Sequence, residues 1–162
     1  MTQKKMSISV SLRPAVNAAL TAAATAENKD LTDYVTDILE RHALDGPFMT
    51  EQDKSDLELL HSLTERVVET AVRLVAEGQF RDSITADSIA ICEQDEKWLA
   101  DYRKYVRDEP YKNGNPRKGN INPNFGYWVK KSLGAKSKMK DKKAENRKVL
   151  GSVIQSYTPL EL

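Results

Sequence analysis

The chain has 162 residues, of which 40 % are hydrophobic and 30 % are charged, so it can form one domain or two small ones around a modest core. A single cysteine excludes an internal disulfide framework, and two distant histidines give no metal-ligand spacing. No apolar run approaches the roughly 20 residues that span a bilayer, so we expect a cytoplasmic protein with no membrane partner.

Charge divides the chain into three predicted regions. Residues 51–110 carry 8 basic and 15 acidic side chains, whereas residues 111–148 carry 12 basic and 2 acidic side chains. A net charge of +10 on the latter is typical of a surface for nucleic acid or an acidic partner, although a solvated lysine-rich tail explains it equally well. We therefore distinguish an N-terminal region (1–46), an acidic helical region (47–110) and a basic, aromatic-containing C-terminal segment (111–162).

The first predicted element is an amphipathic strand that ends before Pro14. Side chains alternate along a strand between its two faces, and apolar residues alternate here with polar or basic ones. Proline cannot continue a central strand and is favoured in the first turn of a helix. The apolar positions are Met6, Ile8, Val10 and Leu12, and the polar positions are Lys5, Ser7, Ser9, Ser11 and Arg13.

Two short helices are predicted after this strand. Residues 14–27 are rich in alanine with apolar side chains at helical spacing, and Asn28 is a suitable residue for ending the helix. Asp30 can cap a second amphipathic helix from Leu31 to about Leu44, which the Gly46-Pro47 pair ends.

One strand and two helices within about 45 residues resemble the ribbon-helix-helix superfamily of DNA-binding regulators, of the Arc, MetJ and CopG type. The matching residues are the alternating ISVSL at 8–12 leading into Pro14, the helix end at Asn28, and DLT at 30–32. The resemblance implies a mainly α protein in which two chains pair their single strands into an antiparallel ribbon, so that dimerisation is a condition of folding. The alternative is a strand that joins a sheet elsewhere in the same chain, but no second strand is evident.

The resemblance also implies where double-stranded DNA would bind. The paired ribbon enters the major groove, so Ser7, Ser9 and Ser11 would contact bases; alternatively, these serines only face solvent. The free amides of a helix N-terminus hold a phosphate, although the Asp30 carboxylate would compete for them. The implied contacts to the DNA backbone come from Lys4, Lys5, Arg13, Leu31 and Thr32.

A long helix is predicted over residues 50–77, because Thr50 and Asp53 resemble a capping box and leucines and valines follow at spacings of three and four. Such a rod needs a partner to cover its apolar stripe. Helical residues 82–108 are one solution, and an oligomerisation bundle that would make a tetramer through residues 50–77 is the other.

The C-terminal segment opens with loop composition over residues 111–124, followed by a short aromatic helix or turn (125–133) and a weak last helix (144–157). Its lysines are candidate accessory nucleic-acid contacts, with nearby rings available for stacking; alternatively, Phe125, Tyr127, Trp128 and Val129 form a small core that the lysines solvate. The accessory candidates are Lys130, Lys131, Lys136, Lys138, Lys140, Lys142, Lys143 and Arg147.

No catalytic motif, nucleotide fingerprint or cysteine–histidine pair is evident, so we expect no enzyme, no catalytic residues, no metal and no cofactor. The expected function is a homodimeric, sequence-specific, nucleoid-associated DNA-binding protein, most often a bacterial or bacteriophage transcriptional repressor of its own promoter. One alternative is an accessory protein of plasmid transfer or partition. Another is an antitoxin-like or anti-host factor that binds a protein partner through residues 47–162.

Overall fold

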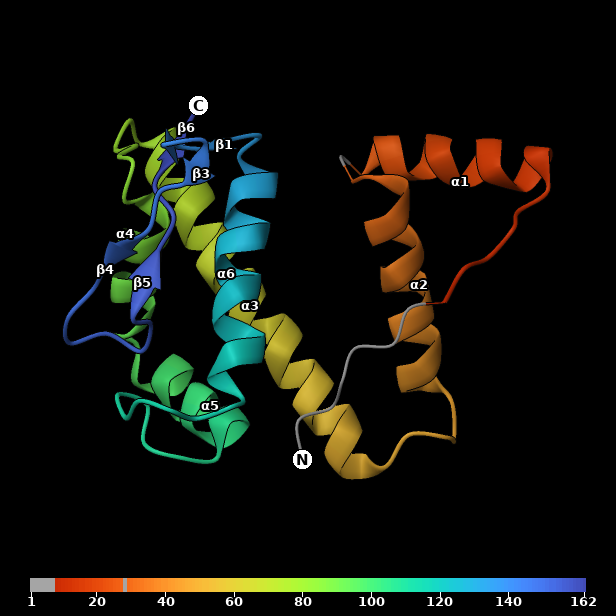
Figure 1. Cartoon of the computed structure of the whole chain (residues 1–162). Coiled ribbons are helices and arrows are strands. Elements are labelled where there is room, and N and C mark those ends of the chain that lie inside the picture. Colours follow the sequence, from red (N-terminus) through yellow and green to blue (C-terminus); the bar gives the residue numbers. More distant parts are fainter. Residues whose placement is uncertain (1–7, 28) are drawn as a thin grey trace. The chain divides into compact units, whose positions relative to one another are not determined.

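The computed structural model describes residues 8–27 and 29–162, which form a mainly helical protein with small strand pairs (Figure 1). The chain divides into a first unit that ends at Ser55 and a second unit from Asp56 to Leu162. This boundary falls within a long helix, α3 (Glu51–Ala76), whose first residues belong to the first unit.

The first unit contains two helices, α1 (Pro14–Ala26) and α2 (Leu31–Asp45). Pro14 is the first helical residue of α1, and the Asp30 carboxylate caps α2 by accepting a hydrogen bond of 2.9 Å from the Asp33 amide. Both predicted helix starts are confirmed. The two helices pack on each other, but among the described residues of this unit only Ala24 is buried.

The described part of the predicted N-terminal strand is not a strand. Residues 8–13 form no strand, and Arg13 has extended backbone angles that lead directly into α1. The physical reason is that a strand needs a neighbour for its backbone hydrogen bonds, and the described part of this single chain pairs none with residues 8–13. Residues 4–7 of the predicted strand lie outside the described residues.

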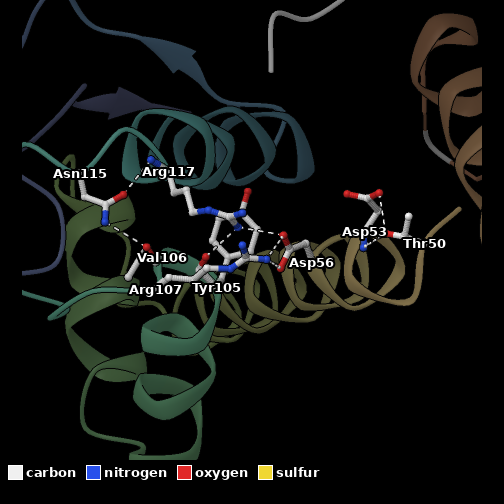
Figure 2. Close-up of polar contacts among 8 residues, drawn as sticks. All are labelled: Thr50, Asp53, Asp56, Tyr105, Val106, Arg107, Asn115 and Arg117. Atoms are coloured by element: carbon white, nitrogen blue, oxygen red, sulfur yellow. Dashed lines mark hydrogen bonds and ion pairs between the residues drawn. The ribbon is translucent and has the colours of Figure 1, made fainter. Parts of the chain in front are cut away.

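The start of α3 is the capping arrangement expected from the sequence. The Thr50 hydroxyl accepts a hydrogen bond of 3.1 Å from the Asp53 amide and donates one of 2.7 Å to the Asp53 carboxylate (Figure 2). The long predicted helix is therefore confirmed. Its apolar stripe lies in the second unit, where Leu63, Val67, Ala71 and Leu74 are buried.

Three further helices cover this stripe: α4 (Ile84–Cys92), α5 (Glu96–Val106) and α6 (Lys118–Ser132). The predicted helical residues 82–108 are confirmed as α4 and α5. The two helices are separated because the Asp95 carboxylate caps α5, accepting hydrogen bonds from the amides of Lys97 at 2.9 Å and Trp98 at 3.2 Å. One hydrophobic core joins α3–α6 with the C-terminal residues Val153, Ile154 and Leu160.

The loop predicted over residues 111–124 is wrong in its second half, because α6 begins at Lys118 and contains Pro123. Local propensity disfavours a proline inside a helix. Burial outweighs it here: Ile121, Phe125 and Val129 form a stripe that is fully buried in the core. Of the aromatic residues expected to pack around it, Tyr127 is exposed and Trp128 is half-buried.

The predicted last helix over residues 144–157 is also wrong. This region contains two-residue strands separated by an irregular loop, in which Gly151 has a positive φ of 71°. The apolar side chains that suggested a helix differ in burial: Val153 and Ile154 are buried, whereas Leu150 is 95 % exposed. The strand pairs are all antiparallel: β1 (Lys136–Ser137) with β6 (Leu160–Glu161), β2 (Met139–Lys140) with β3 (Lys143–Ala144), and β4 (Arg147–Lys148) with β5 (Ser156–Tyr157).

An ion cluster around Asp56 fixes the start of α6 (Figure 2). The Asp56 carboxylate lies 2.9 Å from Arg107 at the end of α5 and 2.9 Å from Arg117 just before α6, and Arg117 also donates to the Tyr105 carbonyl at 3.1 Å. Burial raises the pKa of Asp56, but the hydrogen bonds and charges of the two arginines outweigh it, so the pKa lies below its ordinary value. The cluster therefore holds α3, α5 and α6 together.

Within the described ranges, no helix is long and apolar enough to cross a membrane, and no group of histidine, cysteine, aspartate and glutamate side chains is arranged to hold a metal ion.

Candidate nucleic-acid interface

The N-terminal residues that the resemblance places on DNA are accessible where they are described. Ser9, Ser11 and Arg13 are all exposed. The residues of the opposite face are exposed too, with Ile8 at 80 % and Val10 at 68 %. Lys4, Lys5 and Ser7 lie outside the described residues.

The exposed apolar surface of the first unit is not limited to residues 8–12. Val16 on α1 is 45 % exposed, and Ile38 and Leu39 on α2 are 37 % and 59 % exposed. Exposed apolar side chains on both helices and on the preceding segment leave apolar area that a second protein surface could cover.

The N-terminus of α2, the predicted phosphate site, is surrounded by acidic side chains. Thr32 is exposed and Leu31 is half-buried. The Asp30 carboxylate accepts a hydrogen bond from the Asp33 amide, so one of the amides that a phosphate would need is already occupied. Lys29 does not neutralise the acidic side chains at the start of α2, because it is paired with two other carboxylates. Its ammonium lies 2.7 Å from Asp37 and 2.9 Å from Glu27, and hydrogen bonds to these two carboxylates raise its pKa.

Among the C-terminal candidates, the lysines of the β2–β3 hairpin are all exposed. Asp141 and Lys142 form its two-residue turn with φ values of 52° and 64°, as expected for a type I′ turn. Lys140 and Lys143 lie directly opposite each other across the hairpin. Two like charges at opposed positions destabilise a strand pair, so the charges of these two lysines do not stabilise the hairpin. Lys136 in β1 is exposed as well.

Two other candidates hold the fold together instead. Lys138 lies 2.9 Å from the Asp82 carboxylate, and Arg147 lies 3.0 Å from the same carboxylate and 2.8 Å from Glu145. The hydrogen bond from Lys138, followed by that from Arg147, lowers the pKa of Asp82. These pairs attach the C-terminal strands to the loop before α4, so Lys138 and Arg147 are partly engaged within the protein.

The remaining candidates, Lys130 and Lys131, lie at the end of α6. The Lys131 ammonium is 5.3 Å from the centre of the Tyr127 ring and 5.8 Å from that of Trp128, and it donates to the Tyr127 hydroxyl at 3.2 Å. A cation over an aromatic face is a stabilising contact, so Lys131 acts partly in packing. Lys130 lines a groove of about 710 Å³ beside α6.

This groove is the feature that sequence reasoning missed. It lies between α6 and the C-terminal segment 153–160, which come together only in the folded chain. The available sequence signal is a pair of glycines seven residues apart, Gly119 and Gly126, which lie on the same face if the segment is a helix. Because the composition around Gly119 predicts a loop, the sequence alone does not indicate this shared face.

No family model, curated protein or solved structure matches this chain. The functional conclusion therefore depends on the residues and geometry described above.

Proposed function

We propose that the protein is a homodimeric, sequence-specific DNA-binding protein that uses residues 4–13 of two chains as an antiparallel ribbon and acts as a transcriptional repressor. The observation that carries this proposal is the unburied apolar surface of the first unit. Ile8, Val10 and Leu12 are exposed in alternation with serines, directly before two helices that begin at Pro14 and Leu31.

A second copy of the chain is the occupant that suits this surface. A strand-like segment has unpaired backbone groups that a second identical segment can satisfy, and pairing would place both sets of apolar side chains against the four helices. Burying apolar area is the main stabilising effect available to so small a unit. Dimerisation would then complete a core that a single copy lacks.

Pairing would also create the DNA-contacting face. Because side chains on a strand alternate, covering Ile8, Val10 and Leu12 leaves Ser9, Ser11 and Arg13 on the outer face of the ribbon. A two-stranded ribbon fits the major groove, where serine hydroxyls can donate to or accept from base edges. The exposed lysines of the β2–β3 hairpin would add sequence-independent attraction to the DNA backbone.

Two neighbouring substitutions separate dimerisation from DNA contact. Val10→Glu places a charge on the face that the dimer buries, so we expect a monomer in analytical ultracentrifugation and complete loss of a gel shift with the DNA upstream of the gene. Ser11→Glu, the matched control, puts the same charge on the outer face; it should stay dimeric and bind that DNA at least about tenfold more weakly through repulsion of phosphates.

Each outcome has a clear meaning. A Val10→Glu protein that remains dimeric shows that the ribbon is not the dimer interface. A dimeric Ser11→Glu protein with unchanged DNA affinity shows that the outer face does not contact DNA. Replacing Lys5 and Arg13 by glutamine should flatten the dependence of log affinity on log salt concentration, because fewer counterions are released.

A further inference from the structure

The groove beside α6 has the dimensions and rigidity of a ligand site. Its volume of about 710 Å³ lies within the usual range for small-molecule sites. Its two walls are fastened together, because the Asn122 side chain on α6 donates to the Val153 carbonyl at 3.1 Å and accepts from the Tyr102 hydroxyl at 2.8 Å. The Glu93 carboxylate holds the second wall by accepting from the Val153 amide at 2.6 Å. The groove is therefore formed before any ligand arrives.

Thr85 lines this groove, but its hydroxyl oxygen is not accessible from it. Thr85 is only 4 % exposed, and in the described part of the chain its hydroxyl oxygen is buried and has no hydrogen-bond partner. Thr85 is the second residue of α4, so no carbonyl of the same helix lies four residues before it to accept the hydroxyl proton. A ligand in the groove would therefore bond to other groups of the lining.

Two glycines keep the groove open along α6. Gly119 and Gly126 both line it, and a Cβ atom added at either position would meet no heavy atom within 4 Å. Neither glycine is therefore required by packing within the protein, although a glycine inside a helix lowers helix stability. Their value is that a ligand can approach the backbone of α6 closely.

The charged side chains of the lining are both cationic. The lining contains no aspartate or glutamate but includes Lys118 and Lys130. Lys118 is 7 % exposed, its ammonium donates to the carbonyls of Pro110 and Lys112, and the nearby carboxylates of Asp108 and Glu93 offset part of its charge. Lys130 is therefore the side chain that would attract an anionic ligand.

The neutral part of the lining suits a planar, hydrogen-bonding ligand. Tyr127 and Tyr157 offer aromatic rings for stacking. Side-chain amides and hydroxyls can both donate and accept, as the edges of nucleobases require. The groups of this kind that also line the groove are Asn146, Gln155, Ser156 and Thr158.

We propose that this groove binds a nucleoside phosphate unit, either as a free nucleotide or as one unpaired nucleotide of a single strand. Lys130 would hold the phosphate, the amide and hydroxyl side chains of the lining would bond to the edge of the base, and a tyrosine ring would stack on the base. The site lies wholly within the second unit, so it is independent of the proposed ribbon and of double-stranded DNA binding.

Isothermal titration calorimetry of the full-length protein with adenosine, guanosine, cytidine and uridine monophosphates tests the free form. Fluorescence anisotropy with a labelled oligothymidylate tests the strand form. We expect saturable binding of at least one of these probes at concentrations below about 1 mM. Inorganic phosphate and ribose 5-phosphate should bind much more weakly, because they lack the base.

Substitutions in the groove give the decisive comparison. Gly126→Leu should abolish binding by filling the groove without disturbing the fold, whereas Asn120→Leu, on an exposed part of α6 outside the lining, should leave binding unchanged. Lys130→Gln should weaken binding about tenfold, and Lys104→Gln, which removes the same charge from the surface of α5, should have no effect.

Thr85→Val is a control at a buried position of the lining. It removes an unpartnered buried hydroxyl at nearly constant volume, so thermal unfolding should occur at the same temperature or higher, while nucleotide affinity should stay unchanged. Unchanged affinity in Gly126→Leu, or no binding of any probe up to about 1 mM, overturns the proposal. Val10→Glu should bind nucleotides normally, so failure of the ribbon and failure of the groove are separate results.

Discussion

The first unit and the second unit are both built from amphipathic helices, yet they bury apolar side chains to different extents. The second unit has a continuous core from Leu63 on α3 to Leu160 in β6. In the described part of the first unit, only Ala24 is buried, and Val10 and Leu39 are more than half exposed. The comparison shows that amphipathic sequence alone does not make a core: the second unit supplies its own covering elements, whereas the first is expected to obtain them from a second copy.

The largest expected effect is on the core of the second unit. Phe125 is fully buried and its ring centre lies 5.9 Å from that of Trp98, so Phe125→Ala should lower the free energy of unfolding by about 3–5 kcal/mol. Both tryptophans, Trp98 and Trp128, belong to this unit, so tryptophan fluorescence reports its unfolding. Tyr111→Ala, at an exposed aromatic side chain of the same unit, is the control and should change stability little.

Disrupting the Asp56 cluster should lower the free energy of unfolding of the second unit by a smaller amount. Asp56→Asn removes the carboxylate shared by Arg107 and Arg117 and should cost about 2 kcal/mol, because the exposed Arg107 and the half-buried Arg117 both lose their charged partner. Chemical denaturation followed by tryptophan fluorescence measures this change. Asp101→Asn, which makes the same change in net charge on α5, should cost much less; equal costs would show that Asp56 acts only through net charge.

Dilution separates the two units directly. If the first unit is completed by a second copy, each tenfold dilution should weaken it by about 1.4 kcal/mol, because its stability includes a dimerisation equilibrium. The second unit should not respond. Thermal unfolding by far-UV circular dichroism should therefore show one transition that depends on protein concentration, while tryptophan fluorescence shows one that does not. Two concentration-independent transitions would contradict the dimer.

The smallest expected effect concerns acid stability. Asp82 has a pKa below its ordinary value of 3.8 because Lys138 and Arg147 donate to its carboxylate. A lowered folded-state pKa means that its contribution is present above about pH 4 and is lost as the pH falls through the folded-state value. Asp82→Asn should therefore reduce the dependence of stability on pH below about pH 4 in the second unit. An acid unfolding curve identical in shape to that of the parent protein would show that this surface cluster contributes nothing.

Helix starts were predictable from the sequence because they are local. Pro14, Asp30 and the Thr50–Asp53 pair each act within four residues, and each begins the predicted helix in the structure. The start of α6 was not predictable in this way. The composition of residues 111–124 favours a loop, and only the burial of Ile121, Phe125 and Val129 by other elements makes residues 118–124 helical.

The C-terminal strands and the groove also could not be predicted from local sequence. A two-residue strand has no periodicity to detect, and the partner of β1 lies at β6, beyond β2–β5 in the chain. The apolar spacing at Val149, Leu150, Val153 and Ile154 is compatible with a helix. In the folded chain, however, the backbone of Val153 hydrogen-bonds to the side chains of Glu93 and Asn122 instead of to a neighbouring helical turn. The residues that line the groove come from α4, α6 and the C-terminal segment, so no local pattern could have grouped them.

Sequence by itself determined the uneven charge, the amphipathic segments and the residues at which α1, α2 and α3 begin, since these follow from neighbours within a few positions. Tertiary structure alone decided that residues 118–124 are helical, that Lys138 and Arg147 are bound to Asp82, and that Thr85, Gly126 and Lys130 line one groove. The physical reason is that burial and ion pairing act between residues that are close in space but far apart along the chain.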